Sequence, residues 1–260
     1  MWFMWIFVIL ILFCVFSSKA KYYFKFFFFF LGIIVAGSLG TFRALKEGKS
    51  TNTFFFCFGW FSIVYKWMGL EFIIRGSEHL DTDESVIVVA NHQSSLDVYT
   101  MTKIYPRNCS VILKSSLRFV PVFNWMTYLA DAIFIDRFTK EKSKYSLHLA
   151  LEKIKKFKRK IFLFPEGTRN SKKELLPFKK GAFILSKEAD VSVVPVVFSR
   201  YNRFLNHQET RWDYGGKIII QVLPPMDPKD FASLEAMSDE CRTKMENELD
   251  RLDEELGNIS

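Results

Sequence analysis

The stretch VIVVANHQSSLDVYT, residues 86–100, decides the fold expected for this chain of 260 residues. It begins with a run of apolar, mostly β-branched residues, as in a strand that is buried on both faces. The run stops at Asn91, so His92 follows at the carboxyl end of the strand and an acid, Asp97, comes five positions later. Open α/β sheets bind their ligands at the carboxyl ends of strands. The stretch therefore predicts a buried strand with a functional site at its end.

The chemistry available to His92 depends on this acidic neighbour. A histidine is the usual general base for a hydroxyl group, and a carboxylate on its other ring nitrogen fixes the tautomer and stabilises the imidazolium. Asp97 is placed to supply that carboxylate. The same residues fit a capping box, with Ser94 as the N-cap and Asp97 at N3, which would only start a helix. The two interpretations are compatible.

The chain from residue 71 onward alternates short β-branched runs with amphipathic or polar stretches. This pattern predicts an α/β fold with a mostly parallel central sheet flanked by helices. The expected strands are 86–90, 110–113, 132–135, 161–164, 192–198 and 217–222. The expected helices are 96–104, 117–129, 140–157 and 181–189, followed by an acidic helix after Pro228.

The first seventy residues differ in composition and predict a hydrophobic helical membrane region, residues 1–70, before a catalytic domain, residues 71–260. About 20 apolar residues cross a bilayer core, so residues 1–16 and 26–42 are predicted as two spans. A cleaved signal peptide is the alternative for the first. Residues 54–70 are rich in aromatic side chains, which predicts a segment lying in the membrane interface.

The formal charge of +8 and the pI near 9.2 favour anionic partners: phospholipid head groups, phosphorylated substrates or nucleic acid. A phosphate loop for nucleotides is excluded, because EGKST at residues 47–51 has Arg43 in place of the first glycine. The four cysteines are far apart and form no pair with metal-ligand spacing, which predicts free thiols and no metal site.

Other predicted strands also end in polar residues. IFLFPEGTRN, residues 161–170, presents Glu166, Gly167, Thr168 and Arg169 after its strand. Glycine lets the backbone approach a ligand, arginine offers a planar fork for phosphate, and threonine adds a donor. IFIDR, residues 133–137, and LLPFKKGAF, residues 175–183, add cations at a strand end and at a helix start. Convergence of these ends on one sheet edge predicts a phosphate site.

Four blocks in order, NHQSSLD (91–97), FIDR (134–137), FPEGTRN (164–170) and VPVV (194–197), resemble the motif blocks of the glycerolipid acyltransferases. The likeness runs from residue 71 through 225 and is greatest to the 1-acyl-sn-glycerol-3-phosphate acyltransferases, also called lysophosphatidic acid acyltransferases. It implies transfer of an acyl group from acyl-CoA to the sn-2 hydroxyl of lysophosphatidic acid, giving phosphatidic acid, in a multi-pass protein of the endoplasmic reticulum membrane. Acyl-CoA is then a co-substrate, and no cofactor is implied.

The resemblance also implies roles for individual residues. His92 would be the general base, Asp97 its partner, and no acyl-enzyme would form. Contacts to the glycerol phosphate would come from Glu166, Gly167 and Arg169, joined by Thr168 as a donor, and further phosphate contacts from Arg137, Lys114 and Lys179. Pro195 lies in the block linked to the acyl donor. The expected partners are acyl-CoA, lysophosphatidic acid and a phospholipid membrane, and no nucleic acid.

Three alternatives stay open at this point. The acceptor could be another lysophospholipid or glycerol-3-phosphate. A membrane serine esterase or phospholipase would use Ser94 or Ser95, but the chain has no G-x-S-x-G elbow. A lipid-binding or nucleic-acid-binding protein would use the basic run EKIKKFKRK, residues 152–160, for which a solvated helix face is the default.

The membrane orientation is not fixed by the sequence. Basic residues flank the predicted span 26–42 on both sides, so the distribution of positive charge favours neither orientation. Asn108, Cys109 and Ser110 match the pattern for N-glycosylation, and a glycan there would place the catalytic domain in the lumen.

Overall fold

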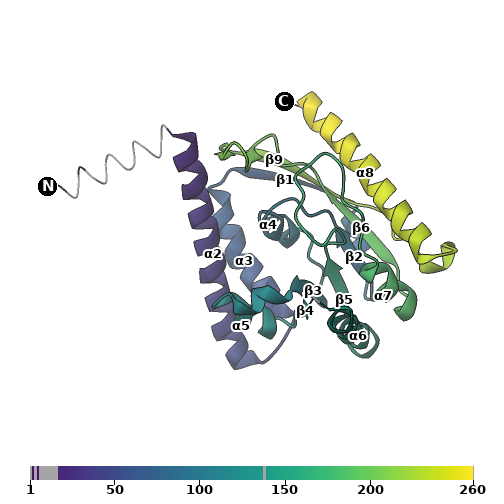
Figure 1. The fold of residues 1–260 in the computed structure, drawn as a ribbon. Helices are drawn as coiled ribbons and strands as arrows, with labels where there is room; N and C mark the ends of the chain where they lie inside the picture. Colours follow the sequence, from purple (N-terminus) through teal and green to yellow (C-terminus); the bar gives the residue numbers. More distant parts are fainter. Residues whose placement is uncertain (1, 3–4, 6–16, 137–138, 260) are drawn as a thin grey trace.

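The architecture is a seven-stranded sheet with helices on both faces (Figure 1). The computed structural model describes residues 2, 5, 17–136 and 139–259. The strands lie in the order β1-β9-β6-β2-β5-β3-β4, and neighbours run parallel except for β6 and β9. Their bounds are β1 Leu70–Arg75, β2 Ile87–Ala90, β3 Cys109–Lys114, β4 Ile133–Ile135, β5 Lys160–Leu163, β6 Val193–Phe198 and β9 Gly216–Val222. The predicted α/β fold with a mostly parallel sheet is confirmed.

Each face of the sheet carries its own core. Along β2, Val88 and Ala90 face one core, whereas Ile87 and Val89 face the other, as the alternation of a strand requires. The first core is shared with α2 Ser18–Glu47, α3 Asn52–Lys66, α4 Asp97–Thr102 and α5 Phe123–Leu129. The second is shared with α6 Lys140–Phe157, α7 Gly181–Ala189 and α8 Leu234–Ile259. Figure 1 shows these two layers on opposite sides of the sheet.

The direction of the strands places the predicted polar strand ends together. Strands β2 to β6 all point the same way, so their carboxyl ends form one edge of the sheet. A two-stranded hairpin, β7 Leu205–Asn206 and β8 Arg211–Trp212, follows β6. The chain then returns along β9, antiparallel to β6.

Two predicted elements differ from the structure. The interfacial block was expected to run on to residue 70, and no strand was expected there, but Leu70–Arg75 forms edge strand β1. Its apolar residues continue those of α3, which hides the boundary in the sequence. The predicted helix 117–129 is broken into a 3-10 turn, Ser115–Phe119, and α5. Pro121 explains the break, because proline disfavours helical backbone in the residue before it, and Val120 is extended.

The N-terminal region forms a pair of packed helices. Helix α2 begins earlier than the predicted span 26–42, because Ser17 caps it by accepting a hydrogen bond from the Ala20 N–H at 3.3 Å. It is 30 residues long and is apolar enough to cross a bilayer. Apart from Trp2 and Trp5, the predicted span 1–16 lies outside the described residues.

The described cysteines, Cys57, Cys109 and Cys241, are free and buried. Burial raises the pKa of Cys109 and that of Cys241 to about 12, so both thiols stay protonated near neutral pH. Within the part of the chain that the structure describes, no group of His, Cys, Asp and Glu side chains has the arrangement of a metal site.

Candidate active site

The loop after β2 leaves the sheet because an asparagine side chain takes the place of strand backbone. Asn91 Nδ2 donates to the Phe198 carbonyl at 3.0 Å, and Asn91 Oδ1 accepts from the Phe198 N–H at 2.8 Å. These bonds are buried and tie the end of β2 to the end of β6. The next residue, His92, is thereby set at the carboxyl edge of the sheet.

His92 and Asp97 are in direct contact. His92 Nδ1 lies 2.6 Å from Asp97 Oδ2, and the same oxygen accepts from the backbone N–H groups of Gln93 at 2.7 Å and Ser94 at 3.0 Å. The Asp97 side chain is 1% exposed, while that of His92 is 20% exposed. Since Nδ1 is engaged, Nε2 is the ring nitrogen that remains for a substrate.

The capping interpretation of this turn is only half right. Helix α4 begins at Asp97 with Leu96 as its N-cap, not at Ser94 as the capping box required. Ser94 Oγ accepts from the Leu96 N–H at 3.3 Å, and only the return bond from Ser94 N to the Asp97 carboxylate matches the box. The carboxylate that closes the turn therefore also orients the imidazole.

An aromatic ring from the residue after β5 supports His92. The rings of His92 and Phe164 stack with centroids 4.1 Å apart and an interplanar angle of 18°. Phe164 belongs to the same core as α2 and α3, so His92 lies toward the face that carries the N-terminal helices. The stacking fixes the plane of the imidazole, which a hydrogen bond to Asp97 alone does not do.

Glu166 lies behind the histidine and bridges two loops. Its Oε1 accepts from the His92 N–H at 2.9 Å and its Oε2 from the Leu176 N–H at 3.0 Å, and Asn170 Nδ2 lies 3.4 Å from Oε2. The residue is 2% exposed, and burial raises the pKa of its carboxyl group. Both oxygens are occupied by the protein, so the geometry gives Glu166 a part in holding the backbone of His92.

The rest of the β5 loop is open to solvent. Gly167 has a φ of 75°, a left-handed conformation that favours glycine, and Thr168 and Arg169 are exposed. Since β2 and β5 are neighbours, these residues and His92 share the same part of the edge. The Asn170 N–H donates to the His92 carbonyl at 2.7 Å, so the exposed residue Arg169 is on a loop that contacts the backbone of His92.

Of the other predicted phosphate contacts, Lys114 is more distant in the sheet, whereas Lys179 lies against the β5 loop. Lys114 is exposed at the end of β3, two strands from β2 and thus about 10 Å away. Lys179 is exposed just before α7, and its backbone N–H donates to the Pro165 carbonyl at 2.8 Å. Arg137 lies outside the described residues.

Pro195, predicted for the acyl-donor region, is a buried residue of β6. It lies in register with Val89, and its carbonyl accepts from the Leu223 N–H at 2.8 Å. Its neighbours Val194 and Val196 face the core on the His92 side, so strand alternation puts Pro195 on the opposite face.

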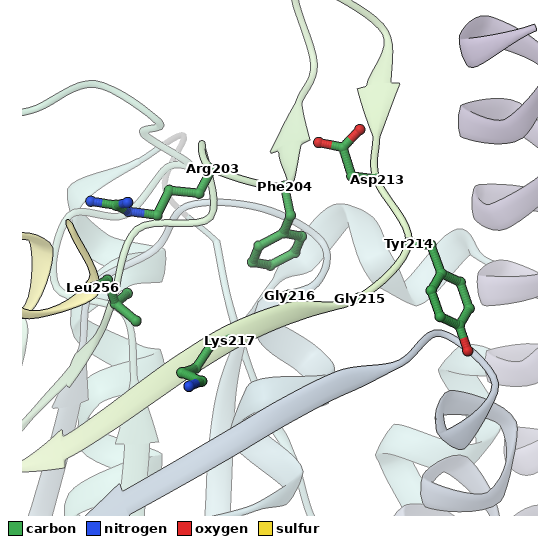
Figure 2. Close-up of a pocket in the computed structure, with 8 residues that line it drawn as sticks. All are labelled: Arg203, Phe204, Asp213, Tyr214, Gly215, Gly216, Lys217 and Leu256. Atoms are coloured by element: carbon green, nitrogen blue, oxygen red, sulfur yellow. The ribbon is translucent and has the colours of Figure 1, made fainter. Parts of the chain in front are cut away.

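One contact of the turn was missed in the sequence: His207, in the β7–β8 hairpin, places Nε2 3.1 Å from Ser94 Oγ. A lone histidine in a polar loop carries no signal for such a contact. A pocket of about 500 Å³ lies beyond this hairpin, lined by Arg203, Phe204, Asp213, Tyr214, Gly215, Gly216, Lys217 and Leu256 (Figure 2). None of the predicted site residues lines it.

Comparisons with known proteins identify the family of this chain. The sequence model of the acyltransferase family matches residues 71–199. The "Putative 1-acyl-sn-glycerol-3-phosphate acyltransferase acl-1" of Caenorhabditis elegans is 43% identical over 228 residues, which are 88% of this chain and 87% of that protein. Human "1-acyl-sn-glycerol-3-phosphate acyltransferase beta" is 33% identical, over 77% of this chain and 73% of its own.

A solved structure is similar in fold. The crystal structure of the 1-acyl-sn-glycerophosphate (LPA) acyltransferase PlsC from Thermotoga maritima superposes with a TM-score of 0.74. The match covers 91% of this chain and 98% of that one at 23% sequence identity. The strand and helix arrangement described above therefore recurs over nearly the whole length of both proteins.

Proposed function

Because the chain belongs to the 1-acyl-sn-glycerol-3-phosphate acyltransferase family, whose members are O-acyltransferases, we propose that it converts lysophosphatidic acid to phosphatidic acid. The acyl group comes from acyl-CoA and goes to the sn-2 hydroxyl, with His92 as the general base. The single observation that carries this mechanism is the 2.6 Å contact between His92 Nδ1 and the buried carboxylate of Asp97.

The proposed reaction uses that contact. His92 Nε2 takes the proton of the acceptor hydroxyl while the hydroxyl oxygen attacks the thioester carbonyl, and CoA leaves as a thiolate. Asp97 stabilises the imidazolium and holds the ring so that Nε2 faces the substrate. The stacked ring of Phe164 limits rotation of the imidazole. Orientation of the two substrates at one edge supplies a further part of the rate.

Recognition of the phosphate falls to the β5 loop. Arg169 is exposed and follows the left-handed turn at Gly167, which suits a charge-assisted contact with the acceptor phosphate. Thr168 adds a hydroxyl donor at the same place. Lys179, whose backbone is bonded to the β5 loop, and the more distant Lys114 raise the local positive potential.

A covalent serine intermediate is disfavoured by the state of Ser94. Ser94 is 3% exposed, and its Oγ accepts a hydrogen bond from the Leu96 N–H at 3.3 Å. His207, not His92, is the histidine that contacts it. Direct transfer from acyl-CoA to the acceptor is therefore the better account of the site.

The membrane location is part of the proposal. The outward side chains of α2 include Phe27, Phe30, Ile34 and Phe42, which are 48% to 69% exposed. An apolar face of this kind is suited to lipid rather than water. Together with residues 1–16, it supports a multi-pass protein, and the family likeness supports the endoplasmic reticulum as its membrane.

The test is an assay of purified protein in phospholipid vesicles with labelled acyl-CoA. Lysophosphatidic acid is offered beside glycerol-3-phosphate and lysophosphatidylcholine, and the position of acylation is read by mass spectrometry. We expect phosphatidic acid, and a loss of at least about a hundredfold in rate for His92→Ala, the low end of general-base contributions. Preference for another acceptor would change the substrate, and an active, folded His92→Ala variant would refute the mechanism.

A further inference from the structure

We propose that His207 is a positioning residue that ties the catalytic turn to helix α2, through Tyr22 on one ring nitrogen and Ser94 on the other. His207 Nδ1 lies 2.7 Å from the Tyr22 hydroxyl, and His207 Nε2 lies 3.1 Å from Ser94 Oγ. One imidazole thus joins residues that are 72 positions apart in the sequence, Tyr22 and Ser94. The inference rests on the proposed role of His92.

The hairpin that carries His207 is fastened to α2 at several points. Lys25, a buried residue of α2, donates through Nζ to the carbonyls of Trp212 at 3.2 Å and Asp213 at 2.6 Å. Trp212 is 2% exposed, and its ring packs against Phe26 with a centroid distance of 4.6 Å. Figure 2 shows the chain leaving the hairpin at Asp213, with Tyr214 turned toward the N-terminal helices. The position of the hairpin is therefore tied to the position of α2.

The loop of the hairpin is itself well defined. Asn206 Oδ1 accepts from the N–H groups of Gln208 at 2.9 Å and Glu209 at 3.1 Å, an Asx turn directly after β7. At its base, Arg211 donates to the carbonyls of Arg203 at 3.0 Å and Asn202 at 2.9 Å. His207 is held between these two fixed points, so a displacement of the hairpin would carry the imidazole with it.

Ser94 transmits this position to the catalytic pair. Its backbone N–H donates to Asp97 Oδ2 at 3.0 Å, and Asp97 Oδ2 is the atom that contacts His92. A shift of Ser94 therefore moves a donor of the carboxylate that orients the base. Misplacement of a reacting group by about 1 Å can lower a rate about a hundredfold, so a smaller shift is enough for a measurable effect.

The protonation state of His207 suits a link of this kind. Burial, and then the charge of Arg169, lower the pKa of His207, while Asp97 acts in the opposite direction. A neutral imidazole has one N–H and one acceptor nitrogen, so it makes one bond in each sense with the two hydroxyl groups. Its ring also lies 5.6 Å from that of Phe26, at 35°.

Three substitutions of His207 separate the two bonds. His207→Phe keeps an aromatic ring beside Phe26 and removes both bonds. His207→Gln places an amide near the position of Nε2 and keeps the bond to Ser94, whereas His207→Asn places an amide near Nδ1 and keeps the bond to Tyr22. The matched control is His148→Phe on α6, at a histidine whose side chain is 64% exposed.

The assay is phosphatidic acid formation by the full chain in vesicles, with kcat and KM measured for both substrates and the melting temperature recorded for each variant. We expect His207→Phe and His207→Asn to lower kcat about tenfold with KM changed by less than about twofold. His207→Gln keeps the Ser94 bond and loses the Tyr22 bond, and Tyr22→Phe loses the same bond, so each should lower kcat only about threefold. His148→Phe should match the unmodified protein.

Two results would overturn the inference. One is a folded His207→Phe variant whose kcat is within about twofold of the unmodified protein, and the other is equal kcat for His207→Gln and His207→Phe. If His207→Phe does not fold, the kcat values of His207→Gln and Tyr22→Phe test the inference instead. An unchanged kcat for Tyr22→Phe would refute the link between His207 and α2. His92→Ala in the same assay separates the two claims, because retained activity there refutes the proposed function itself.

Discussion

Two buried aspartates at opposite edges of the sheet differ in what surrounds their charge. Asp97, at the carboxyl edge, receives His92 Nδ1 and two backbone N–H groups. Asp131 lies before β4, at the edge of the sheet formed by the amino ends of the parallel strands (the amino edge). It faces three cations: Lys153 Nζ at 2.5 Å, Lys49 Nζ at 3.1 Å and Arg159 Nε at 3.4 Å. Fixed charges neutralise Asp131, whereas the contacts of Asp97 described here are with dipoles and with the His92 ring. In the proposed mechanism, Asp97 can assist proton transfer because its charge is left to a histidine.

The amino edge has a structural task. Lys49 belongs to the turn between α2 and α3, so its ion pair with Asp131 fastens that turn to the domain, next to a bond from Ser50 N to the Leu129 carbonyl at 2.9 Å. Burial alone would raise the pKa of Asp131, but the hydrogen bonds and charges of Lys153 and Lys49 outweigh it and lower the pKa. The Asp131 carboxylate is therefore held in its ionised form and is fixed in place by its ion pairs.

The largest effect expected from this comparison is on activity at the carboxyl edge. Asp97→Asn keeps the shape of the side chain but removes the charge that stabilises the imidazolium. We expect kcat to fall by about a hundredfold or more while the melting temperature changes little. The measurement is steady-state phosphatidic acid formation beside a thermal melt. A variant with nearly normal kcat would show that Asp97 has a structural role, like Asp131.

The matched change at the amino edge is Asp131→Asn, and it should act on stability. It leaves three like charges around a neutral amide, and breaking a buried pair costs about 3 to 5 kcal/mol. Because Lys49 is partly solvated, we expect the free energy of unfolding to fall by about 2 to 3 kcal/mol, with kcat per folded molecule unchanged within about twofold. Urea unfolding, monitored by tryptophan fluorescence, measures it.

The pH dependence of this loss has a defined sign. A carboxyl group with a lowered pKa in the folded state stabilises the fold above its ordinary pKa of 3.8, and this stabilisation disappears as the pH falls through the folded value. The difference between the two proteins should be full at pH 6 and shrink below about pH 4. A difference that is the same at pH 3 and pH 6 would contradict the ion-pair account.

A smaller effect, on substrate binding, is expected from replacing Arg169, which differs from Arg159 in its ion pairs. Arg159 is committed to the Asp131 cluster, whereas Arg169 has no ion pair within residues 17–136 and 139–259. Arg169→Ala should raise the KM for lysophosphatidic acid about tenfold, from the loss of a charged hydrogen bond, and leave acceptors without phosphate almost unaffected. Lys114→Ala is the control, with a change of about threefold or less. Equal losses on both acceptor classes would count against phosphate recognition by Arg169.

The smallest expected effect is at the sequon of the amino edge, where we predict no glycan. Asn108 Nδ2 donates to the carbonyls of Phe157 at 3.1 Å and Lys158 at 2.9 Å, and Ser110 is fully buried. An attached sugar would have to break both bonds. The intact mass of the protein purified from eukaryotic cells, before and after treatment with an endoglycosidase, should be the same. A loss of mass corresponding to one glycan would show that this edge faces the lumen.

Local patterns were sufficient for the elements whose side chains follow one period. Helix α6 lies at residues 140–157 as predicted, and the six predicted strands are all present, since their β-branched runs end in polar residues. The contact of His92 with Glu166 also followed from strand ends on one edge of a parallel sheet. These predictions needed no knowledge of which strands are neighbours beyond the direction they share.

Features that depend on tertiary contacts could not be predicted in this way. Strand β1 continues an apolar helix in the sequence and is defined only by its pairing with β9. The burial of Glu166 depends on the approach of the Leu176 loop, and the contact of His207 with Ser94 depends on where α2 holds the hairpin. Sequence proximity carries none of this information, because each contact joins segments brought together by the fold.

The central claim is that Asp97 acts through His92, and a double-mutant cycle tests it most directly. The rates of phosphatidic acid formation are measured for His92→Ala, Asp97→Asn and the double variant, with circular dichroism to confirm that each is folded. Residues that act as one unit show non-additive losses, so the double variant should be no slower than His92→Ala alone. A double variant slowed by the product of the two single effects, or a His92→Ala variant that keeps its rate, would contradict the account.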